Sequence, residues 1–249
     1  NFEHVFMDGK STDNTLQILD QYVGKYEHLH FYSQSDKGIY DAMNMGLERA
    51  TGEWLFFLGV DDTFFNGEVL QNLFGNESLK GYDLLYGAII HSGTKKKFFH
   101  EFDKERLSLM NMSHQGLFTH RRVFEKIGNF SLKYRTLADY EFNMRWFGDG
   151  SFKIKYVDQV ITAYNEEGLS FTYFDKSFYK DKLKLVSKYL EIDERHAAFP
   201  AAANLVCNIQ LKNRDFLNAL KSAFKASRSS GKSFYVRRAF RQIINSVIS

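Results

Sequence analysis

Two adjacent acids, Asp61 and Asp62, are the sharpest chemical feature of the sequence. They follow an unbroken apolar run, Trp54 to Val60, which is typical of a strand buried on both faces. Open α/β sheets bind ligands at the carboxyl ends of their strands, and two neighbouring carboxylates need a positive partner. A hard divalent cation that also holds substrate phosphates is the natural partner. The alternative is an acidic turn that caps the next helix.

Asp8 also ends a predicted strand, residues 4–7, so a parallel sheet would place it on the same edge as Asp61. Its carboxylate could accept hydrogen bonds from a base or a ribose, or it could simply form an Asx turn. The segment Asp36 to Asn44 places a glycine and charges at a strand-to-helix junction, where free N–H groups favour anions. This segment is a weak signal alone, because it is neither GxGxxG nor a P-loop.

Asp139 and Glu141 open a helix that the apolar pattern predicts over residues 139–147. Asp139 could serve as a catalytic base if it faces Asp62, or it could only cap its own helix. His114 and Gln115 precede an apolar strand, where a lone histidine is more often structural.

The elements that must position these residues alternate between strand and helix up to about residue 75, which predicts an α/β domain with a largely parallel sheet. Beyond about residue 175 helical patterns dominate, so we expect one domain over residues 1–170 and a helical extension over 171–249. Further strands are predicted at 82–91, 97–102 and 153–164, and further helices at 123–128, 178–189, 197–211, 216–226 and 235–247.

Composition narrows the function further. The chain has 249 residues, 44% of them hydrophobic and 25% charged, which excludes wholesale disorder. A net charge of +3 is too small to demand a nucleic-acid partner. The single cysteine, Cys207, excludes an internal disulfide and speaks against a cysteine-based zinc site. Because the chain opens with Asn1 and a strand-like run from Phe2, we expect it to begin inside a larger protein.

The C-terminal stretch is strongly basic. Residues 205–249 hold nine Lys or Arg and one acid, Asp215. Docking to an anionic membrane surface is the functional interpretation. A helical cap packed on the domain, or a contact between subunits, explains the pattern equally well.

In this order the segments resemble the family 2 glycosyltransferases, which have the GT-A nucleotide-sugar-binding fold. The resemblance covers about residues 1–165 and is greatest to the bacterial subgroup that builds capsule, exopolysaccharide and lipopolysaccharide sugars. It implies a GT-A-like α/β fold, with a mostly parallel central sheet flanked by helices and a helical C-terminal extension. The segments that carry it are Asp8–Thr15, Asp36–Gly46, Ala50–Trp54 with Leu58–Asp62, His114-Gln115 and Ala138–Glu141.

The resemblance also implies roles. Asp8 would contact the nucleotide base, Asp61 would lie near the ribose, Asp62 would bind Mn²⁺ or Mg²⁺, and Asp139 would be the general base. The expected reaction is an inverting, metal-dependent transfer from a nucleotide diphosphate sugar, with UDP as the expected nucleotide, to a hydroxyl of a glycan or lipid-linked acceptor. The enzyme would then work in the cytoplasm or at the inner face of the membrane. The residues expected to bind the donor are Asp8, Asp36, Lys37, Asn44 and Asp61.

The sequence departs from the family pattern in three places. The chain starts at what resembles the family's second strand, so roughly thirty residues of the fold are expected to be missing and the sheet would lack a central strand. Ala138 stands where an acid usually precedes the base. Processive members carry Gln-x-x-Arg-Trp, whereas Phe142 here precedes Arg145-Trp146, so we expect one sugar per acceptor.

Three other functions stay open at this level. A nucleotidyltransferase would need a glycine-rich triphosphate loop, which the sequence does not show. A non-catalytic scaffold would bind partners through the basic tail. Hydrolysis by paired carboxylates is a weaker alternative.

Overall fold

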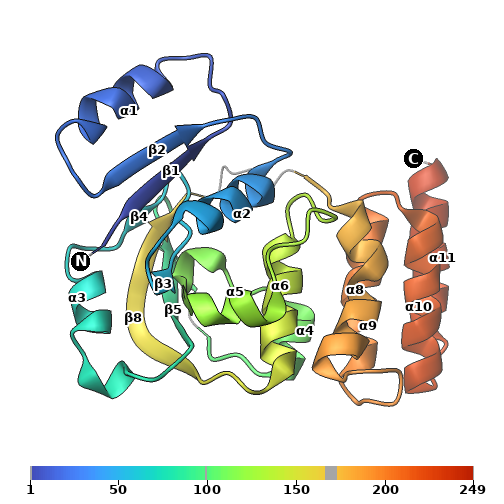
Figure 1. Ribbon diagram of the computed structural model, residues 1–249. Helices are drawn as coiled ribbons and strands as arrows, with labels where there is room; N and C mark the ends of the chain where they lie inside the picture. Colours follow the sequence, from blue (N-terminus) through green and yellow to red (C-terminus); the bar gives the residue numbers. More distant parts are fainter. Residues whose placement is uncertain (1, 99, 166–172, 249) are drawn as a thin grey trace. The chain divides into compact units, whose positions relative to one another are not determined.

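The computed structural model describes residues 2–98, 100–165 and 173–248. The chain forms two compact units (Figure 1). The first comprises residues 1–100, 113–142 and 151–171, and the second comprises 101–112, 143–150 and 172–249. The domain boundary expected at residue 170 lies outside the described residues and stays a prediction.

The first unit begins with a small parallel sheet. Strand β1 (His4–Asp8) pairs with β2 (Leu29–Ser33), and Asp8 lies opposite Ser33. Helix α1 (Thr15–Val23) connects the two strands, and α2 (Ile39–Arg49) packs against β1 (Figure 1). This strand–helix–strand arrangement agrees with the sequence pattern.

A larger sheet forms the rest of the first unit. Its strands lie in the order β3-β7-β5-β8-β4, and β6 pairs with the remaining length of β5. Only β5 and β8 run parallel in this sheet; the other described pairings are antiparallel. The strands are β3 (Trp54–Leu55), β4 (Thr63–Phe64), β5 (Leu84–His91), β6 (Lys97–Phe98), β7 (Leu117–His120) and β8 (Ile154–Tyr164).

The α/β class and the helical C-terminal region are confirmed, but the sheet is more mixed than predicted. The apolar run from Trp54 to Val60 contributes only two residues to a ladder. Its two phenylalanines nevertheless pack on opposite sides, because Phe56 stacks on Phe118 with ring centroids 4.3 Å apart and Phe57 meets Phe130 edge-on at 5.3 Å. Val60, at the end of the run, is fully exposed. The apolar pattern of this run therefore reflects side-chain packing on two sides, not hydrogen-bonded pairing of its backbone.

Short helices cover the larger sheet. They are α3 (Val69–Phe74), α5 (Arg121–Ile127) and the 3-10 turns η1 (Glu77–Leu79) and η2 (His114–Gly116). Strand β5 is buried along nearly its whole length, as expected for a central strand. The predicted strand at 97–102 is described only as β6, and residue 99 lies outside the described residues. One core cluster comprises Val69, Leu73, Leu79, Leu85, Phe118 and Ile161.

The second unit is helical. Helix α6 (Ala138–Asp149) starts in the first unit and ends in the second, where Gly148 lies against α8. A Cβ on Gly148 would meet the Tyr189 carbonyl oxygen at 2.0 Å, so only glycine allows this approach. No helix in the described part of the chain could span a bilayer. The other helices are α4 (Lys104–Leu109), α8 (Lys176–Leu190), α9 (Phe199–Lys212), α10 (Phe216–Ser230) and α11 (Phe234–Ile248).

Candidate active site

The carboxylates of Asp61 and Asp62 converge over Gly59, in the turn that precedes β4. A Cβ on Gly59 would lie 2.7 Å from Asp62 Oδ2 and 3.3 Å from Asp61 Oδ1. The Asp62 N–H donates to the Gly59 carbonyl at 3.2 Å, which closes the turn. Asp62 is buried and Asp61 is exposed. The absence of a side chain at Gly59 is therefore what lets the two carboxylates share one small region.

Asp62 is anchored at the end of β8. The backbone N–H of Asn165, the residue after β8, donates to Asp62 Oδ1 at 3.1 Å. Strand β4 begins at Thr63, which pairs with Ala163 of β8. This anchoring occupies one carboxylate oxygen and leaves Oδ2 on the side of Gly59 and Asp61.

The donor chemistry of this pair fits a hard divalent cation. Carboxylate oxygens are the ligands that Mg²⁺ and Mn²⁺ prefer, and Mg²⁺ usually keeps several waters and substrate phosphates. Among the described residues no group of three or more His, Cys, Asp or Glu could hold a metal ion. Two carboxylates leave most coordination positions of such a cation to waters and phosphate oxygens.

Asp139 is held by groups from two other elements. It is the second residue of α6 and is buried. The Tyr40 hydroxyl of α2 donates to Asp139 Oδ1 at 2.7 Å, and His114 Nδ1 of η2 lies 3.4 Å from Oδ2. The N-terminal end of α6 also stabilises a negative charge. A carboxylate oriented on both oxygens in this way is suited to accept a proton from a bound ligand.

The end of β8 ties Asp139 and the Asp61–Asp62 pair to the same place. The Thr162 hydroxyl donates to the Gln115 carbonyl at 2.5 Å, and Gln115 follows His114. Thr162 lies only three residues before Asn165, which binds Asp62. The structure therefore brings three of the segments that the sequence singled out to one end of one strand.

Helix α2 connects this region to the turn after β1. Asp36 Oδ1 accepts the Gly38 N–H at 2.8 Å, and a Cβ on Gly9 would lie 2.6 Å from Asp36 Oδ2. Gly38 has φ +122°, a conformation that favours glycine, and α2 starts directly after it. The helix thus begins beside the turn after β1 and presents Tyr40 to Asp139.

Asp8 organises its own turn. Its Oδ2 accepts hydrogen bonds from the Ser33 hydroxyl at 2.6 Å and from the backbone N–H groups of Lys10 and Ser11 at 3.0 and 3.1 Å. Hydrogen bonds from Ser11 and Ser33 lower the pKa of Asp8 below its usual value. The Asx-type interpretation therefore has direct support. Oδ1 accepts a longer bond from the Ser11 N–H, at 3.2 Å, and is the oxygen better placed for a ligand.

The other expected donor-binding residues have different surroundings. The Asn44 side chain exchanges two hydrogen bonds with the backbone of Phe130, both 3.0 Å long, so it ties α2 to the segment before α6. The Lys37 side chain is exposed, and the backbone N–H of Lys37 donates to Asp41 Oδ2 at 2.9 Å. Asn44 thus holds the Phe130 backbone, and its expected part in donor binding stays a prediction. Glu141 is buried in the first turn of α6.

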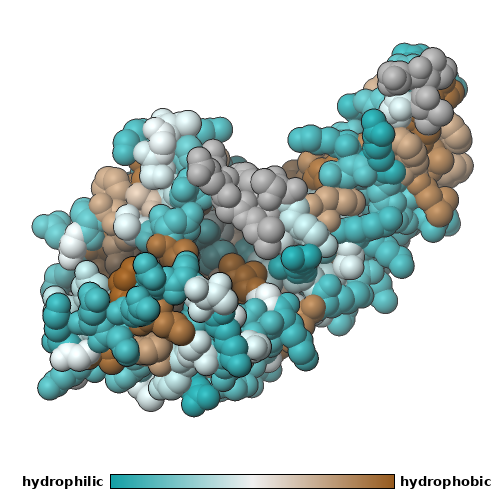
Figure 2. All heavy atoms as spheres, turned by 90° about the horizontal axis from the view of Figure 1, so that it is seen from above, coloured by the Kyte–Doolittle hydropathy of each residue, from teal (hydrophilic) through white to brown (hydrophobic). Residues whose placement is uncertain are grey.

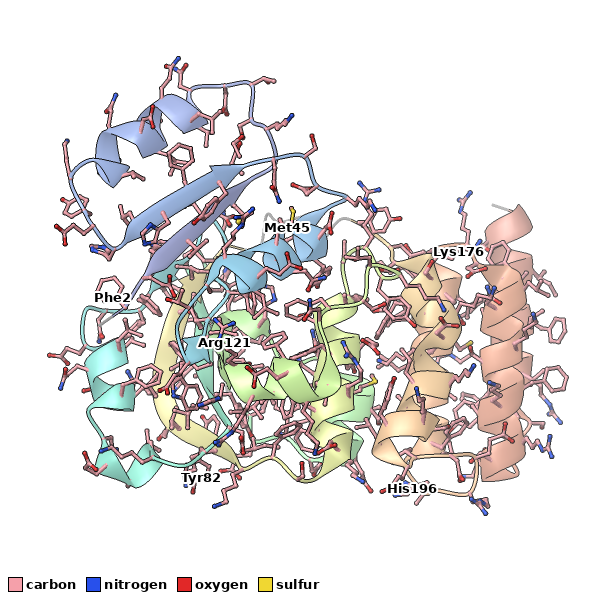
Figure 3. The ribbon with its side chains drawn as sticks, viewed as in Figure 1. Phe2, Met45, Tyr82, Arg121, Lys176 and His196 are labelled. Carbon is pink, nitrogen blue, oxygen red and sulfur yellow. The ribbon has the colours of Figure 1, made fainter. Side chains whose placement is uncertain are left out.

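Two residues important for this arrangement have no separate signal in the sequence. Tyr40 lies in the segment Asp36–Asn44 but looks like an ordinary core aromatic there. Arg121, labelled in Figure 3, donates to the carbonyls of Gly52, Leu47 and Ala50 at 3.0, 3.5 and 2.5 Å and so holds the C-terminal end of α2. Both act on partners about 70 to 100 residues away, which no local pattern reveals.

Phe142 occupies the position where processive relatives carry glutamine. Its ring stacks on Phe124 with centroids 4.5 Å apart and lies 4.9 Å from that of Phe130. The position is therefore part of the aromatic core of the first unit, and it offers no polar group to a ligand.

The chain is similar in sequence to several known glycosyltransferases. A mycobacterial protein, the PGL/p-HBAD biosynthesis glycosyltransferase of Mycobacterium bovis (strain BCG / Pasteur 1173P2), is 40% identical over 185 residues, 72% of each chain. An uncharacterized glycosyltransferase of Haemophilus influenzae is 31% identical over 74 residues, 29% of this chain and 30% of that protein.

Solved structures show the same fold at low sequence identity. S. aureus TarS 1–349 in complex with UDP-GlcNAc has a TM-score of 0.63 at 16% identity, covering 97% of this chain and 83% of that one. The mannosyltransferase PcManGT from Pyrobaculum calidifontis, in complex with GDP-Man and Mn²⁺, has a TM-score of 0.54 at 13% identity, covering 97% and 77%. The expected GT-A-like fold is thereby confirmed.

The family model described as glycosyl transferase family 2 matches residues 1–145, which include Asp8, Asp36, Asp61, Asp62 and Asp139. The chain therefore belongs to glycosyl transferase family 2 and is a glycosyltransferase with a GT-A-like fold.

Proposed function

We propose that the protein is an inverting transferase that moves one sugar from a nucleotide diphosphate sugar to an acceptor hydroxyl. The observation that carries this proposal is the pair of contacts that Tyr40 and His114 make with Asp139, at the strand end that also anchors Asp62. Family membership favours this function over a nucleotidyltransferase or a non-catalytic scaffold. Solved structures of similar fold that are complexed with UDP-GlcNAc or GDP-Man support a nucleotide sugar donor.

In the proposed reaction the acceptor oxygen attacks the anomeric carbon while the bond from that carbon to the diphosphate breaks. The hydroxyl proton passes to Asp139, and a nucleoside diphosphate leaves. A single displacement of this kind inverts the configuration at the anomeric carbon. Asp139 is buried and fixed on both oxygens, so little reorganisation is needed when it accepts the proton.

Tyr40 would stabilise both states of this base. Its hydroxyl lies 2.7 Å from Asp139 Oδ1 and 3.0 Å from the Thr136 carbonyl oxygen, but it has only one hydrogen to donate. While Asp139 is ionised, that hydrogen serves the carboxylate. Once Asp139 is protonated, the hydroxyl can turn to Thr136 and accept a hydrogen bond from Asp139. Tyr40 is thus a positioning residue that acts through the base.

Asp62, with Asp61 beside it, would hold Mn²⁺ or Mg²⁺ together with the donor diphosphate. When bound, such a cation offsets the charge that develops on the leaving diphosphate. The exposed Asp61 carboxylate is available to the ribose, and Asp8 Oδ1 and Asp36 line the turn where the nucleoside would lie. UDP is the nucleotide we propose.

The acceptor we propose is a glycan or lipid-linked hydroxyl used in bacterial surface polysaccharide or glycolipid synthesis. Curated relatives that are 40% identical over 185 residues are named for PGL/p-HBAD biosynthesis, which supports a cell-envelope product. Because Phe142 fills the glutamine position of processive relatives with a core aromatic, we propose that one sugar is added per acceptor. Such acceptors would be met at the inner face of the membrane.

The test is sugar transfer by the Asp139→Asn variant. We expect the rate to fall by about 10²–10⁴-fold, the range for loss of a general base. Glu141→Gln is the matched control, because Glu141 is another buried acid in the first turn of the same helix. Full transfer by Asp139→Asn, or an equal loss in both variants, would contradict the assignment.

A further inference from the structure

Helices α10 and α11 carry large apolar side chains that their packing does not use. Within the second unit the two helices pack through small residues, with Ala219 and Ala223 of α10 and Ala239 of α11 buried around Cys207. Five large apolar side chains point away from this core. Their exposed fractions are Leu217 67%, Phe224 61%, Phe234 59%, Ile244 53% and Phe240 47%.

On each helix these side chains alternate with cations on the outer face. Leu217, Lys221 and Phe224 recur at the spacing of one helix face, opposite the buried alanines. On α11, Phe240 and Ile244 are four residues apart and lie beside Arg237 and Arg241. Figure 2 shows brown hydrophobic residues beside teal hydrophilic ones on the helical unit.

The charge of these two helices is of one sign. Residues 216–248 contain seven Lys or Arg and no Asp or Glu, while the whole chain has a net charge of +3, so the remaining residues sum to −4. Glu194, from the segment before α9, lies 3.6 Å from Arg228 of α10 and offsets one of these cations. An apolar stripe bordered mainly by cations matches the headgroups and the acyl boundary of an anionic bilayer. A second copy of the same surface would bring like charges together at short range, which disfavours association of two copies through this face.

We propose that the outer faces of α10 and α11 form a docking surface for anionic lipid bilayers. The exposed phenylalanines and aliphatic side chains insert at the headgroup level, and the arginines and lysines contact lipid phosphates. This inference goes beyond the transferase function, because lipid binding requires neither the donor nor the acceptor. A failed lipid experiment would therefore leave the proposed reaction untouched.

The experiment measures sedimentation of the full chain with vesicles of phosphatidylcholine, alone or with about one-third phosphatidylglycerol. We expect binding only to the anionic vesicles, and weaker binding as salt is raised, because exposed charges are screened. The charge-reversal variant Lys221→Glu, Arg237→Glu, Arg241→Glu should lower the partition coefficient at least about tenfold. Its matched control is Lys25→Glu, Lys80→Glu, Lys155→Glu, which changes the net charge equally on exposed positions of the first unit.

The apolar contribution has its own variant. Leu217→Ser, Phe224→Ser, Phe240→Ser should weaken binding by a similar factor while leaving the salt dependence unchanged. Ile18→Ser, at an exposed apolar position of α1, should bind as the parent chain does. Circular dichroism establishes whether each variant is folded. If a triple variant does not fold, vesicle binding by Arg241→Glu alone and the salt dependence of binding by the parent chain test the proposal instead.

Three results would overturn the proposal. The first is equal binding of the parent chain to neutral and anionic vesicles, or no binding to either. The second is equal loss of binding in the control and the charge-reversal variant. The third is a dimer in sedimentation velocity that the apolar variant converts to monomer, without vesicle binding, which would make this face a contact between copies.

Discussion

The turn after β1 and the turn before β4 both place aspartates at the end of an apolar run, but they use them differently. At Asp8 one carboxylate oxygen accepts three hydrogen bonds from its own turn and from Ser33. At Asp61 and Asp62 the carboxylates instead face each other over Gly59, and Asn165 anchors only one oxygen of Asp62. In the first turn, the Asp8 carboxylate holds the loop through hydrogen bonds. In the second turn, carboxylate oxygens lie close together, and an added positive charge relieves their repulsion.

The position of an acid at a strand end therefore does not reveal which groups its two oxygens bind. The Asp8 oxygen that accepts three hydrogen bonds stabilises its turn, whereas the converging carboxylates of Asp61 and Asp62 are suited to bind a cation. Substitutions in the two turns should therefore have separable effects on stability and on catalysis.

Among the substitutions that compare the two turns, the largest loss of activity is expected from filling the space above Gly59. Gly59→Ala would place a methyl group 2.7 Å from Asp62 Oδ2 and so displace the carboxylate. We expect donor-dependent transfer to fall about 100-fold, since misplacement by an ångström at a reacting centre can cost that much. The measurement is kcat/KM for the nucleotide sugar.

The control is Gly67→Ala, because a Cβ on Gly67 would meet nothing within 4 Å. If both variants were as active as the parent chain, the proposed difference between the two turns would be wrong.

A smaller effect is expected where α2 meets α6. Tyr40→Phe removes the hydroxyl that bonds Asp139 Oδ1 but keeps the ring against Phe130. We expect kcat to fall about tenfold with KM nearly unchanged, which is the loss of about one hydrogen bond to a charged group. A change in KM alone would indicate a role in substrate binding instead.

The smallest effect on chemistry is expected at Asp8. Asp8→Asn should lower the free energy of unfolding by about 1–2 kcal/mol near neutral pH, as for loss of a loop-closing carboxylate. The pKa of Asp8 is lowered in the folded state, so its stabilisation is present above the unfolded value of about 3.9 and disappears as the pH falls through the folded value.

Urea unfolding at several pH values checks this. The gap between the parent chain and Asp8→Asn should close below about pH 4. Asp20→Asn, at an exposed position of α1, is the control. A gap that stays constant down to the most acidic pH, or one that opens only there, would contradict the structural role given to Asp8.

The sequence predicted the α/β class, the helical C-terminal region and the boundaries of β5, β8 and α6 closely, because long periodic segments report burial directly. It did not predict how strands pair. Phe56 and Phe57, in the run from Trp54 to Val60, pack on opposite sides, yet the run contributes only two residues to the sheet. An apolar pattern depends on side-chain burial, whereas strand pairing depends on partners that are distant in the sequence.

The same limit applies to the site. Asp61, Asp62 and Asp139 stand out in the sequence because they are acidic residues beside strongly apolar segments. Their catalytic roles stay predictions. Tyr40 and His114 could not be assigned, because the contacts with Asp139 join residues 99 and 25 positions apart. The two hydrogen bonds between the Asn44 side chain and the Phe130 backbone could not be predicted either, because these residues are 86 positions apart.

The central claim is that Asp61 and Asp62 form a cation-assisted site for a nucleoside diphosphate. Calorimetric titration of UDP into the protein, with and without Mn²⁺, tests it most directly when the parent chain is compared with Asp62→Asn. The account predicts binding that Mn²⁺ strengthens at least about tenfold in the parent chain and that loses this dependence in the variant. Equal UDP binding by both proteins, with or without Mn²⁺, would contradict it.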